Sequence, residues 1–301
     1  MKLPPLPKGI SGWVYRYSEG VAEQVTLFNS FARPHLRFAY LFPRGGSIGF
    51  PGEQGVAEVY YKGEQSAAYA EGLPPGLLIM PIVDGRTDGG EFDGWTDEQY
   101  AVAARQVADK VIDDPNAAGV QVDIEPFNPD QLPFYRHLTE YLNAAGKYST
   151  MFVGSWNDDV LTRIFDSCDV VVMSGYDLTG EGASLDAYRS AMQASVPRFQ
   201  QIAEQSGKHY MIGIPAAASW GEFEFEVGGG AARVETGVKQ EQYVQAALDA
   251  VRPFLDSPQY VGLSLWHMSD PKAVEDPDTV TERTKFPAAI EPSVWKMLES
   301  Y

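Results

Sequence analysis

Two carboxylates close a short segment in which apolar and polar residues alternate strictly. The segment Ala118–Pro126 reads AGVQVDIEP, with Gln121, Asp123 and Glu125 between valines and an isoleucine. Alternation with a period of two is typical of a β-strand, which turns successive side chains to opposite faces. Residues two apart on one strand have Cα atoms about 6.5–7 Å apart, so the carboxyl groups of Asp123 and Glu125 can approach hydrogen-bonding distance.

Two carboxyl groups held this close together suit acid catalysis. They cannot both ionise easily, so one of the two pKa values rises and that group tends to keep its proton. A protonated carboxylic acid near neutral pH is what a departing glycosidic oxygen requires. The simpler alternative is that Asp123 and Glu125 are solvated residues at the end of a strand, where they bind a metal or a loop arginine.

The carboxylates must be held by the elements around them, and strand-length apolar runs recur along the whole chain. These runs are rich in valine, isoleucine, aromatic residues and glycine. The eight runs are Gly12–Tyr17, Leu36–Phe42, Leu77–Val83, Gly119–Glu125, Thr150–Ser155, Val170–Tyr176, Tyr210–Pro215 and Val261–Trp266.

Helical patterns lie between most of the runs. Thr96 and Gln99 form a capping-box pattern that predicts the start of one helix. A second helix, around Phe134 and Leu138, is closed by Gly146, and a third spans Gln240–Leu255. Strand and helix in alternation predict a (β/α)₈ barrel over residues 1–301 as one domain. A doubly wound open sheet is the alternative, but no Gly-x-Gly-x-x-Gly turn follows the first strand.

In a barrel strand, one face packs on the helices and the other points into the lumen. The apolar set of the carboxylate strand must face the helices, so Gln121, Asp123 and Glu125 are expected in the lumen at its C-terminal end. The irregular stretches Pro43–Gln65 and Ala216–Lys239 are expected to be strand-to-helix loops at that same end.

Composition limits the partners. Asp and Glu number 41 against 23 Lys and Arg, a net charge of −18, which argues against nucleic acid as a partner. No apolar run reaches the roughly 20 residues of a membrane helix. The start, MKLPPLPKGISGW, has no leader-like apolar stretch, so we expect a cytoplasmic protein, or a secreted or periplasmic one if a leader was removed.

Cysteine and histidine usage points away from a metal centre. Cys168 is the single cysteine, and no two of the four histidines have the spacing of metal ligands. We therefore expect no disulfide within the chain, no metal and no cofactor. The expected form is a monomer that acts on an oligosaccharide or polysaccharide.

The carboxylate segment resembles the fourth-strand signature of glycoside hydrolase family 18, the chitinases and endo-β-N-acetylglucosaminidases. That signature reads Asp-Gly-x-Asp-x-Asp-x-Glu. Gly119, Asp123 and Glu125 match it, whereas Ala118 and Gln121 stand where the family has its first two aspartates.

Four further segments resemble the family, in the same order along the chain. Leu36–Phe42 is similar to its second strand, and Met173–Leu178 to its Met-x-Tyr-Asp segment with one extra residue. Ile212–Trp220 is similar to its Gly-x-Pro segment, and Trp266 stands where the family places the tryptophan beneath the sugar.

The resemblance implies a retaining hydrolase in which the 2-acetamido oxygen of the substrate attacks C1, an exception to the usual scheme of two carboxylates. It implies that Glu125 protonates the glycosidic oxygen and that Asp123 orients the acetamido group. Tyr176 would donate a hydrogen bond to the acetamido carbonyl, Asp177 would hold the sugar, and Trp266 would stack beneath it.

Two departures bear on these roles. Gln121 can bind substrate and can form a hydrogen bond with Asp123, but it cannot carry a negative charge, so the proton cycling of Asp123 differs from the family's. The extra residue before Tyr176 either forms a bulge that keeps Tyr176 and Asp177 in the lumen or displaces both.

Aromatic residues at predicted strand ends and in the following loops suit stacking on sugars, although core packing is the alternative for each of them. Those named as candidate sugar contacts, besides Trp266, are Trp13, Tyr40 and Trp156; Tyr15 and Trp220 lie in similar positions. Asp84 directly follows the third run, at the end of that strand, and is expected either to reach the cleft or to form a turn.

Two other functions stay open. A glycan-binding barrel without activity is disfavoured by Glu125 and favoured by Ala118 and Gln121. A glycosidase that acts on sugars without an acetamido group would need a second inward carboxylate, which Asp177 can supply.

Overall fold

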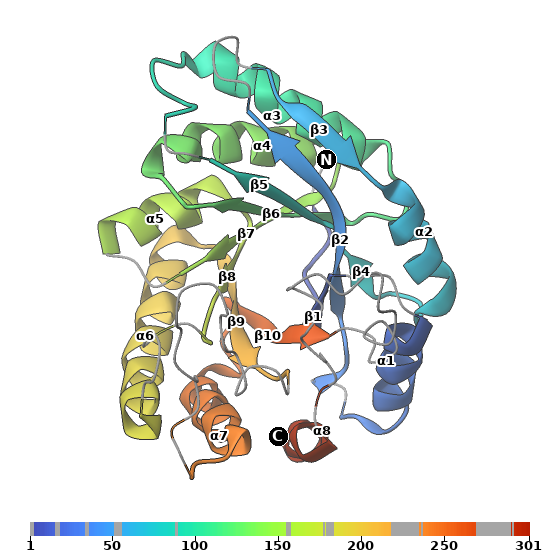
Figure 1. Cartoon of the computed structure of the whole chain (residues 1–301), viewed down its shortest axis with the longest axis vertical. Helices are drawn as coiled ribbons and strands as arrows, with labels where there is room; N and C mark the ends of the chain where they lie inside the picture. The colour runs from blue at the N-terminus through green and yellow to red at the C-terminus, as the bar shows by residue number, and fades with distance from the viewer. Residues whose placement is uncertain are drawn as a thin grey trace.

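The computed structural model describes residues 3–15, 19–33, 36–50, 56–87, 90–154, 158–176, 178, 184–217, 235, 237–268, 290 and 292–301. Within them, eight parallel strands close into a barrel and helices surround it (Figure 1). This confirms the predicted (β/α)₈ barrel. The order around the barrel is β1-β10-β9-β8-β7-β6-β5-β2, and pairing of β1 with β2 closes the ring.

The barrel strands follow the predicted runs, with different ends. They are β1 (Gly9–Val14), β2 (Tyr40–Gly49), β5 (Ile82–Arg86), β6 (Gly119–Glu125), β7 (Tyr148–Val153), β8 (Val170–Met173), β9 (His209–Pro215) and β10 (Tyr260–Met268). Two short strands lie outside the ring: β3 (Glu58–Tyr61) runs antiparallel to β2, and β4 (Leu78–Ile79) pairs with the start of β2.

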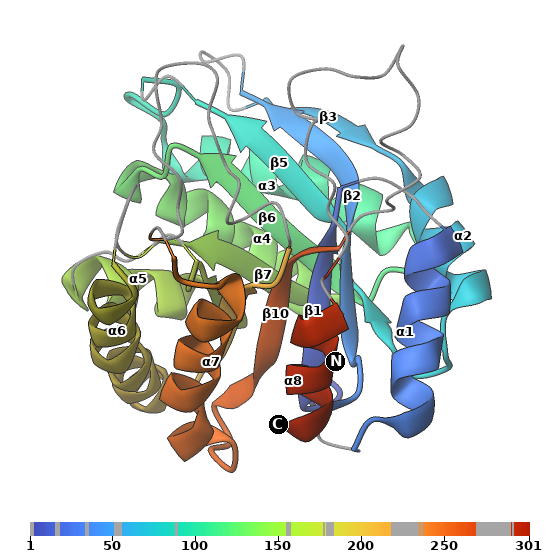
Figure 2. The same ribbon diagram turned by 60° about the horizontal axis from the view of Figure 1, so that its bottom comes forward.

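Helices cover the outside of the barrel in both views (Figures 1 and 2). They are α1 (Glu19–Phe31), α2 (Gly63–Gly72), α3 (Asp97–Ile112), α4 (Leu132–Ala144), α5 (Asp158–Ser167), α6 (Leu185–Ser206), α7 (Gln240–Val251) and α8 (Pro292–Ser300). None of the helices in the described part of the chain is long and apolar enough to cross a membrane.

The predicted signals for α3 and α4 are confirmed. The Thr96 hydroxyl accepts a hydrogen bond from the Gln99 backbone N–H at 3.3 Å, and the Thr96 N–H donates to the Gln99 side chain at 2.8 Å. This reciprocal pair satisfies N–H groups that the first turn leaves unpaired. Gly146, just beyond α4, has a φ of 79°, a left-handed conformation that glycine adopts without strain.

The expectation that Pro43–Gln65 is a loop is wrong. β2 continues to Gly49, β3 pairs back on it, and α2 begins at Gly63. The run is rich in glycine because the two strands approach closely: a Cβ on Gly46 would lie 2.0 Å from the Tyr60 carbonyl oxygen. Most of the second predicted loop, Ala216–Lys239, lies outside the described residues.

The expected helix Gln240–Leu255 is shorter than predicted. α7 ends at Val251, and a single 3₁₀ turn, η4 (Arg252–Phe254), follows it. Pro253 lies in that turn, and a proline has no N–H to continue an α-helical ladder.

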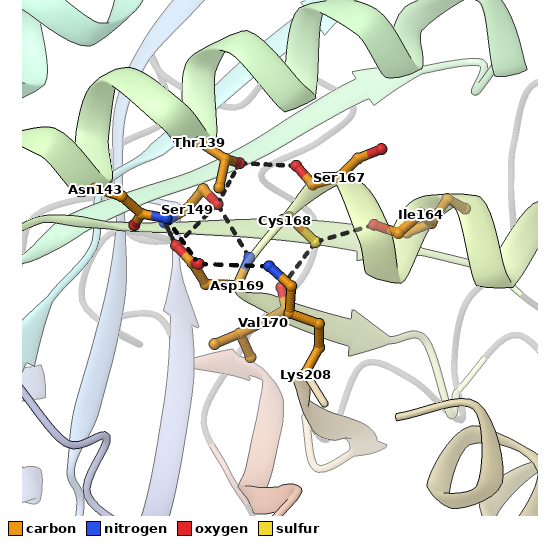
Figure 3. Close-up of polar contacts among 9 residues, drawn as sticks. All are labelled: Thr139, Asn143, Ser149, Ile164, Ser167, Cys168, Asp169, Val170 and Lys208. Atoms are coloured by element: carbon orange, nitrogen blue, oxygen red, sulfur yellow. Dashed lines mark hydrogen bonds and ion pairs between the residues drawn. The ribbon is translucent and has the colours of Figure 1, made fainter. Parts of the chain in front are cut away.

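A buried polar network fastens three strands to α4 at the N-terminal end of the barrel (Figure 3). The Asp169 carboxylate accepts hydrogen bonds from the Ser149 backbone N–H at 2.9 Å and from Asn143 Nδ2 at 3.2 Å. Lys208 Nζ lies 3.8 Å from the same carboxylate. Asp169 thus joins α4, β7 and the start of β8 to the residue before β9, which holds the strands in register.

Candidate active site

The carboxylate strand β6 has one apolar and one polar face, as the alternation predicts. Val120, Val122 and Ile124 are buried under the helices. On the other face, Gln121 is fully buried, Asp123 is half-buried and Glu125 is exposed. Exposure therefore rises along the polar row toward the C-terminal end of the strand, where a barrel opens to solvent.

A hydrogen bond across the barrel shows that this polar face is the lumen. The indole N–H of Trp13, on β1, donates to Gln121 Oε1. Since β1 and β6 are not neighbours in the sheet, the two side chains can meet only through the interior. Asp123 and Glu125 stand two and four residues after Gln121 on the same strand, so they face the lumen and its mouth.

The pKa of the Asp123 carboxyl group is raised to about 7. Burial is the largest cause, the negative charges of Glu125 and Asp84 add to it, and the positive charge of Arg86 opposes it. Close to neutral pH, both protonation states of Asp123 are therefore populated. The sequence predicts one raised carboxyl pKa from charge repulsion, whereas loss of water contributes more here.

The neighbouring strand β5 adds charged groups on the same face. Asp84 pairs in register with Asp123, and Arg86 pairs with Glu125. Asp84 also forms an ion pair with Arg44 of β2 at 3.2 Å, with both side chains partly exposed. Among the described residues, no three histidine, cysteine or acidic side chains are arranged to hold a metal ion.

Aromatic rings line the lumen beside the carboxylates. Tyr176 stacks on Trp266 of β10, with ring centroids 4.8 Å apart and planes 19° apart. The ring of Trp13 lies nearly perpendicular to that of Tyr176, with centroids 5.9 Å apart, and the ring of Phe152 of β7 stacks on Tyr176 with centroids 6.3 Å apart. Contacts with three separate strands place the Tyr176 ring in the lumen, so the extra residue before it does not displace it.

Trp266 is held at its rim position by a second aromatic residue. Its indole N–H donates to the Tyr15 hydroxyl at 3.2 Å. Trp266 is half-buried and Tyr15 is 40% exposed, so this pair borders solvent while Tyr176 lies deeper.

The structure does not place Tyr40 with these residues. The run Leu36–Phe42 predicts it near the C-terminal end of its strand, and that position is wrong. Tyr40 begins β2, which runs on to Gly49, so it lies at the N-terminal end of the barrel. Its ring is fully buried and its hydroxyl donates to the Pro7 carbonyl, just before β1. Tyr40 is a core residue remote from the carboxylates.

Three predicted aromatic or acidic residues cannot be placed: Trp156, Asp177 and Trp220 lie outside the described residues. Conversely, Arg44, Arg86 and Phe152 stand at the site without having been predicted. Arg86 follows Asp84 by two residues, so the alternation in IVDGR signals its face. The position of Arg44 could not be predicted in this way, because the sequence around it, Pro43–Gln65, has the composition of a loop.

Two cavities bounded by described residues, of about 280 and about 500 Å³, lie at the opposite end of the barrel. Gly9, the first residue of β1, and Gly262, near the start of β10, line the smaller cavity. Pro7 and Ala39 line the larger one. Neither touches the carboxylates, so the candidate site rests on the lumen residues and not on these cavities.

No protein-family model matches the chain, and no curated protein matches it significantly. Solved structures match its fold. A GH18 chitinase from the chitin utilization locus of Flavobacterium johnsoniae covers 87% of this chain and 88% of its own at 14% identity, with a TM-score of 0.50. The match to the spore cortex-lytic enzyme SleL of Bacillus megaterium covers 98% of this chain and 74% of SleL, at 12% identity and a TM-score of 0.52. The match to a β-glucuronidase of Lactobacillus rhamnosus covers 98% of this chain and 49% of that enzyme, at 12% identity and a TM-score of 0.54. The chain therefore has a barrel fold similar to that of chitinases and other glycosidases.

Proposed function

We propose that this protein is a glycoside hydrolase that cleaves glycans containing N-acetylglucosamine, with retention and with help from the substrate's acetamido group. The observation that carries the proposal is the inward row Gln121, Asp123 and Glu125, which shares the lumen with the stacked rings of Tyr176 and Trp266. Carboxyl groups beside aromatic rings are what a sugar-cleaving site requires.

Glu125 is the proton donor in this mechanism. It is exposed at the mouth, where it can reach the oxygen between two sugars. Its proton passes to that oxygen as the bond to C1 breaks, while the acetamido oxygen of the same sugar bonds to C1. The resulting Glu125 carboxylate then takes a proton from water, which attacks C1 and restores the acetamide.

Asp123 acts on the acetamido group. It lies deeper than Glu125, on the same face, where the sugar ring would sit over the lumen. As a carboxylate, it accepts the acetamido N–H and stabilises the positive charge of the cyclic intermediate. Its pKa of about 7 leaves this ionised form accessible at neutral pH.

The aromatic residues hold the sugar. Trp266 stacks with the sugar through the face turned away from Tyr176, and the Tyr176 hydroxyl donates to the acetamido carbonyl. Asp177 holds the same sugar, and Asp84 and Trp13 complete the floor of the site.

A product assay on chito-oligosaccharides, with the wild type and Glu125→Gln, tests the proposal. Glutamine keeps the shape but has no proton to give, so hydrolysis should fall about 10²–10⁴-fold. Binding measured by calorimetry should stay within a few-fold. Equal cleavage of glucosides and acetamido sugars by the wild type would contradict the role of the acetamido group.

A second candidate function is glycan binding without hydrolysis. Gln121 favours it, because a neutral amide tied to Trp13 stands where the related motif has an acid. In that case the wild type and Glu125→Gln would bind the same oligosaccharides and neither would release products.

A further inference from the structure

The sheet of the barrel continues beyond its rim through β2 and β3. β2 extends past the ring, and β3 runs back along it at the upper edge of the molecule (Figure 2). In register across these strands, Tyr60 of β3 pairs with Ser47 of β2, Ser47 pairs with Asp84 of β5, and Asp84 pairs with Asp123. Paired residues in a sheet share a face. Tyr60 therefore stands on the same face as the catalytic carboxylates.

The opposite face of β3 is fixed to the helices. The Tyr61 hydroxyl donates to Asp114 Oδ2 at 2.8 Å, just beyond α3. The backbone N–H of Ala57 donates to the Gln106 side chain of α3 at 2.6 Å. Because adjacent residues point to opposite faces, these anchors turn Tyr60 away from the helices.

The end of β2 also packs against the helix side of the sheet. Phe50 packs against Phe92 at 4.9 Å and against Phe134 of α4 at 5.4 Å, on the helix side of the sheet. The end of β2 and β3 therefore form a shelf, one face of which packs on the helices. The other face carries Tyr60, whose side chain is 58% exposed and whose ring centroid lies 5.4 Å from Lys62 Nζ.

We infer that Tyr60 forms a remote sugar-binding subsite, so that the substrate is an extended glycan chain running from the lumen over the shelf. Neighbouring strands lie about 4.8 Å apart, so three spacings separate Tyr60 from Asp123 by about 14 Å along the row. That span suits a chain of several sugars with one of them at Asp123. With Lys62 Nζ over one face of the Tyr60 ring, the other face is the one that stacks on the apolar face of a sugar.

This inference rests on the proposed function, and substrate length separates the two. The experiment measures kcat/KM on a chito-hexasaccharide and on an aryl glycoside of the disaccharide, which cannot reach the shelf. Tyr60→Thr keeps a strand-forming residue and removes the ring. Tyr60→Phe keeps the ring. Leu27→Ala, at an exposed apolar position on α1, is the matched control.

For Tyr60→Thr we expect kcat/KM on the hexasaccharide to fall about 2- to 12-fold, the range of aromatic pair energies, mainly through KM. The disaccharide glycoside should be cleaved as by the wild type, and Tyr60→Phe and Leu27→Ala should match the wild type on both. An equal loss on both substrates, or no loss, would overturn the subsite and leave the proposed function standing. Failure of the wild type to cleave or bind either substrate would overturn both.

Discussion

Trp13 donates its indole N–H to Gln121 across the barrel lumen, from β1 to β6. An indole N–H can only donate, so the amide atom that faces it must be the oxygen. This fixes the orientation of the amide: Gln121 Oε1 faces Trp13 and Nε2 does not. Gln121 Nε2 is buried without a hydrogen-bond partner among the described residues. The Gln121 amide thus keeps a buried N–H donor for which no described residue is an acceptor.

Replacing Gln121 tests this bond. In Gln121→Leu, the buried indole N–H of Trp13 loses its acceptor, which we expect to lower the free energy of unfolding by about 1–3 kcal/mol. Urea denaturation measures it. Trp13→Phe combined with Gln121→Leu should be less damaging than the sum of the two single changes. A simple sum would mean that the two side chains do not interact.

Asp123 should make the protein less stable as pH rises. Its pKa is raised to about 7 in the folded protein, against about 3.9 in an unfolded chain. The folded protein therefore binds more protons between these values, and the stabilising contribution, full below about pH 4, is lost as pH rises through about 7. Asp123→Asn removes this dependence, so its stability relative to the wild type should increase from pH 4.5 to pH 7.5, estimates set by those two pKa values. A constant difference in the free energy of unfolding would contradict the raised pKa.

His267 should make the protein less stable as pH falls, which is the opposite of the effect of Asp123. It is buried beside Trp266, and burial lowers its pKa to about 4. An unfolded chain takes up this proton near pH 6.5, so stability is lost as pH falls from about 6.5 to about 4. His267→Gln should therefore lose less stability over that interval than the wild type in thermal melts. An unchanged acid dependence would show that His267 is not buried in its neutral form.

The network around Asp169 should be a stability element without a part in activity. Asp169→Ala removes the acceptor of the Ser149 N–H and of Asn143 Nδ2. Each hydrogen bond to a charged group contributes about 1.5–3 kcal/mol, so we expect the free energy of unfolding to fall by at least about 1.5–3 kcal/mol. Lys208→Met should lose less, because Lys208 is partly exposed and lies 3.8 Å away. If Lys208→Met costs as much, the ion pair and not the hydrogen bonds stabilises this end of the barrel.

The alternation in Val120–Glu125 was enough to predict which face of β6 carries the carboxylates, since a strand has a period of two and the apolar set must be buried. The repeated runs of strand and helix were likewise enough to predict the barrel. Local capping chemistry predicted the start of α3. These features depend on residues close together in the chain, so the sequence by itself determines them.

Other features were decided only by closure of the barrel. The bond between Trp13 and Gln121 joins residues on strands that are not neighbours. The stack of Tyr176 on Trp266 joins the segment after β8 to β10, which are far apart in the sequence. The sequence predicts the wrong end of β2 for Tyr40, because a strand's length is set by its partners: β2 extends to Gly49 to pair with β3 and β5. The pKa of Asp123 depends on burial in the closed lumen, which no spacing in the sequence measures. The tertiary structure thus decided which of the predicted residues meet, because contacts between distant segments arise only when the ring closes.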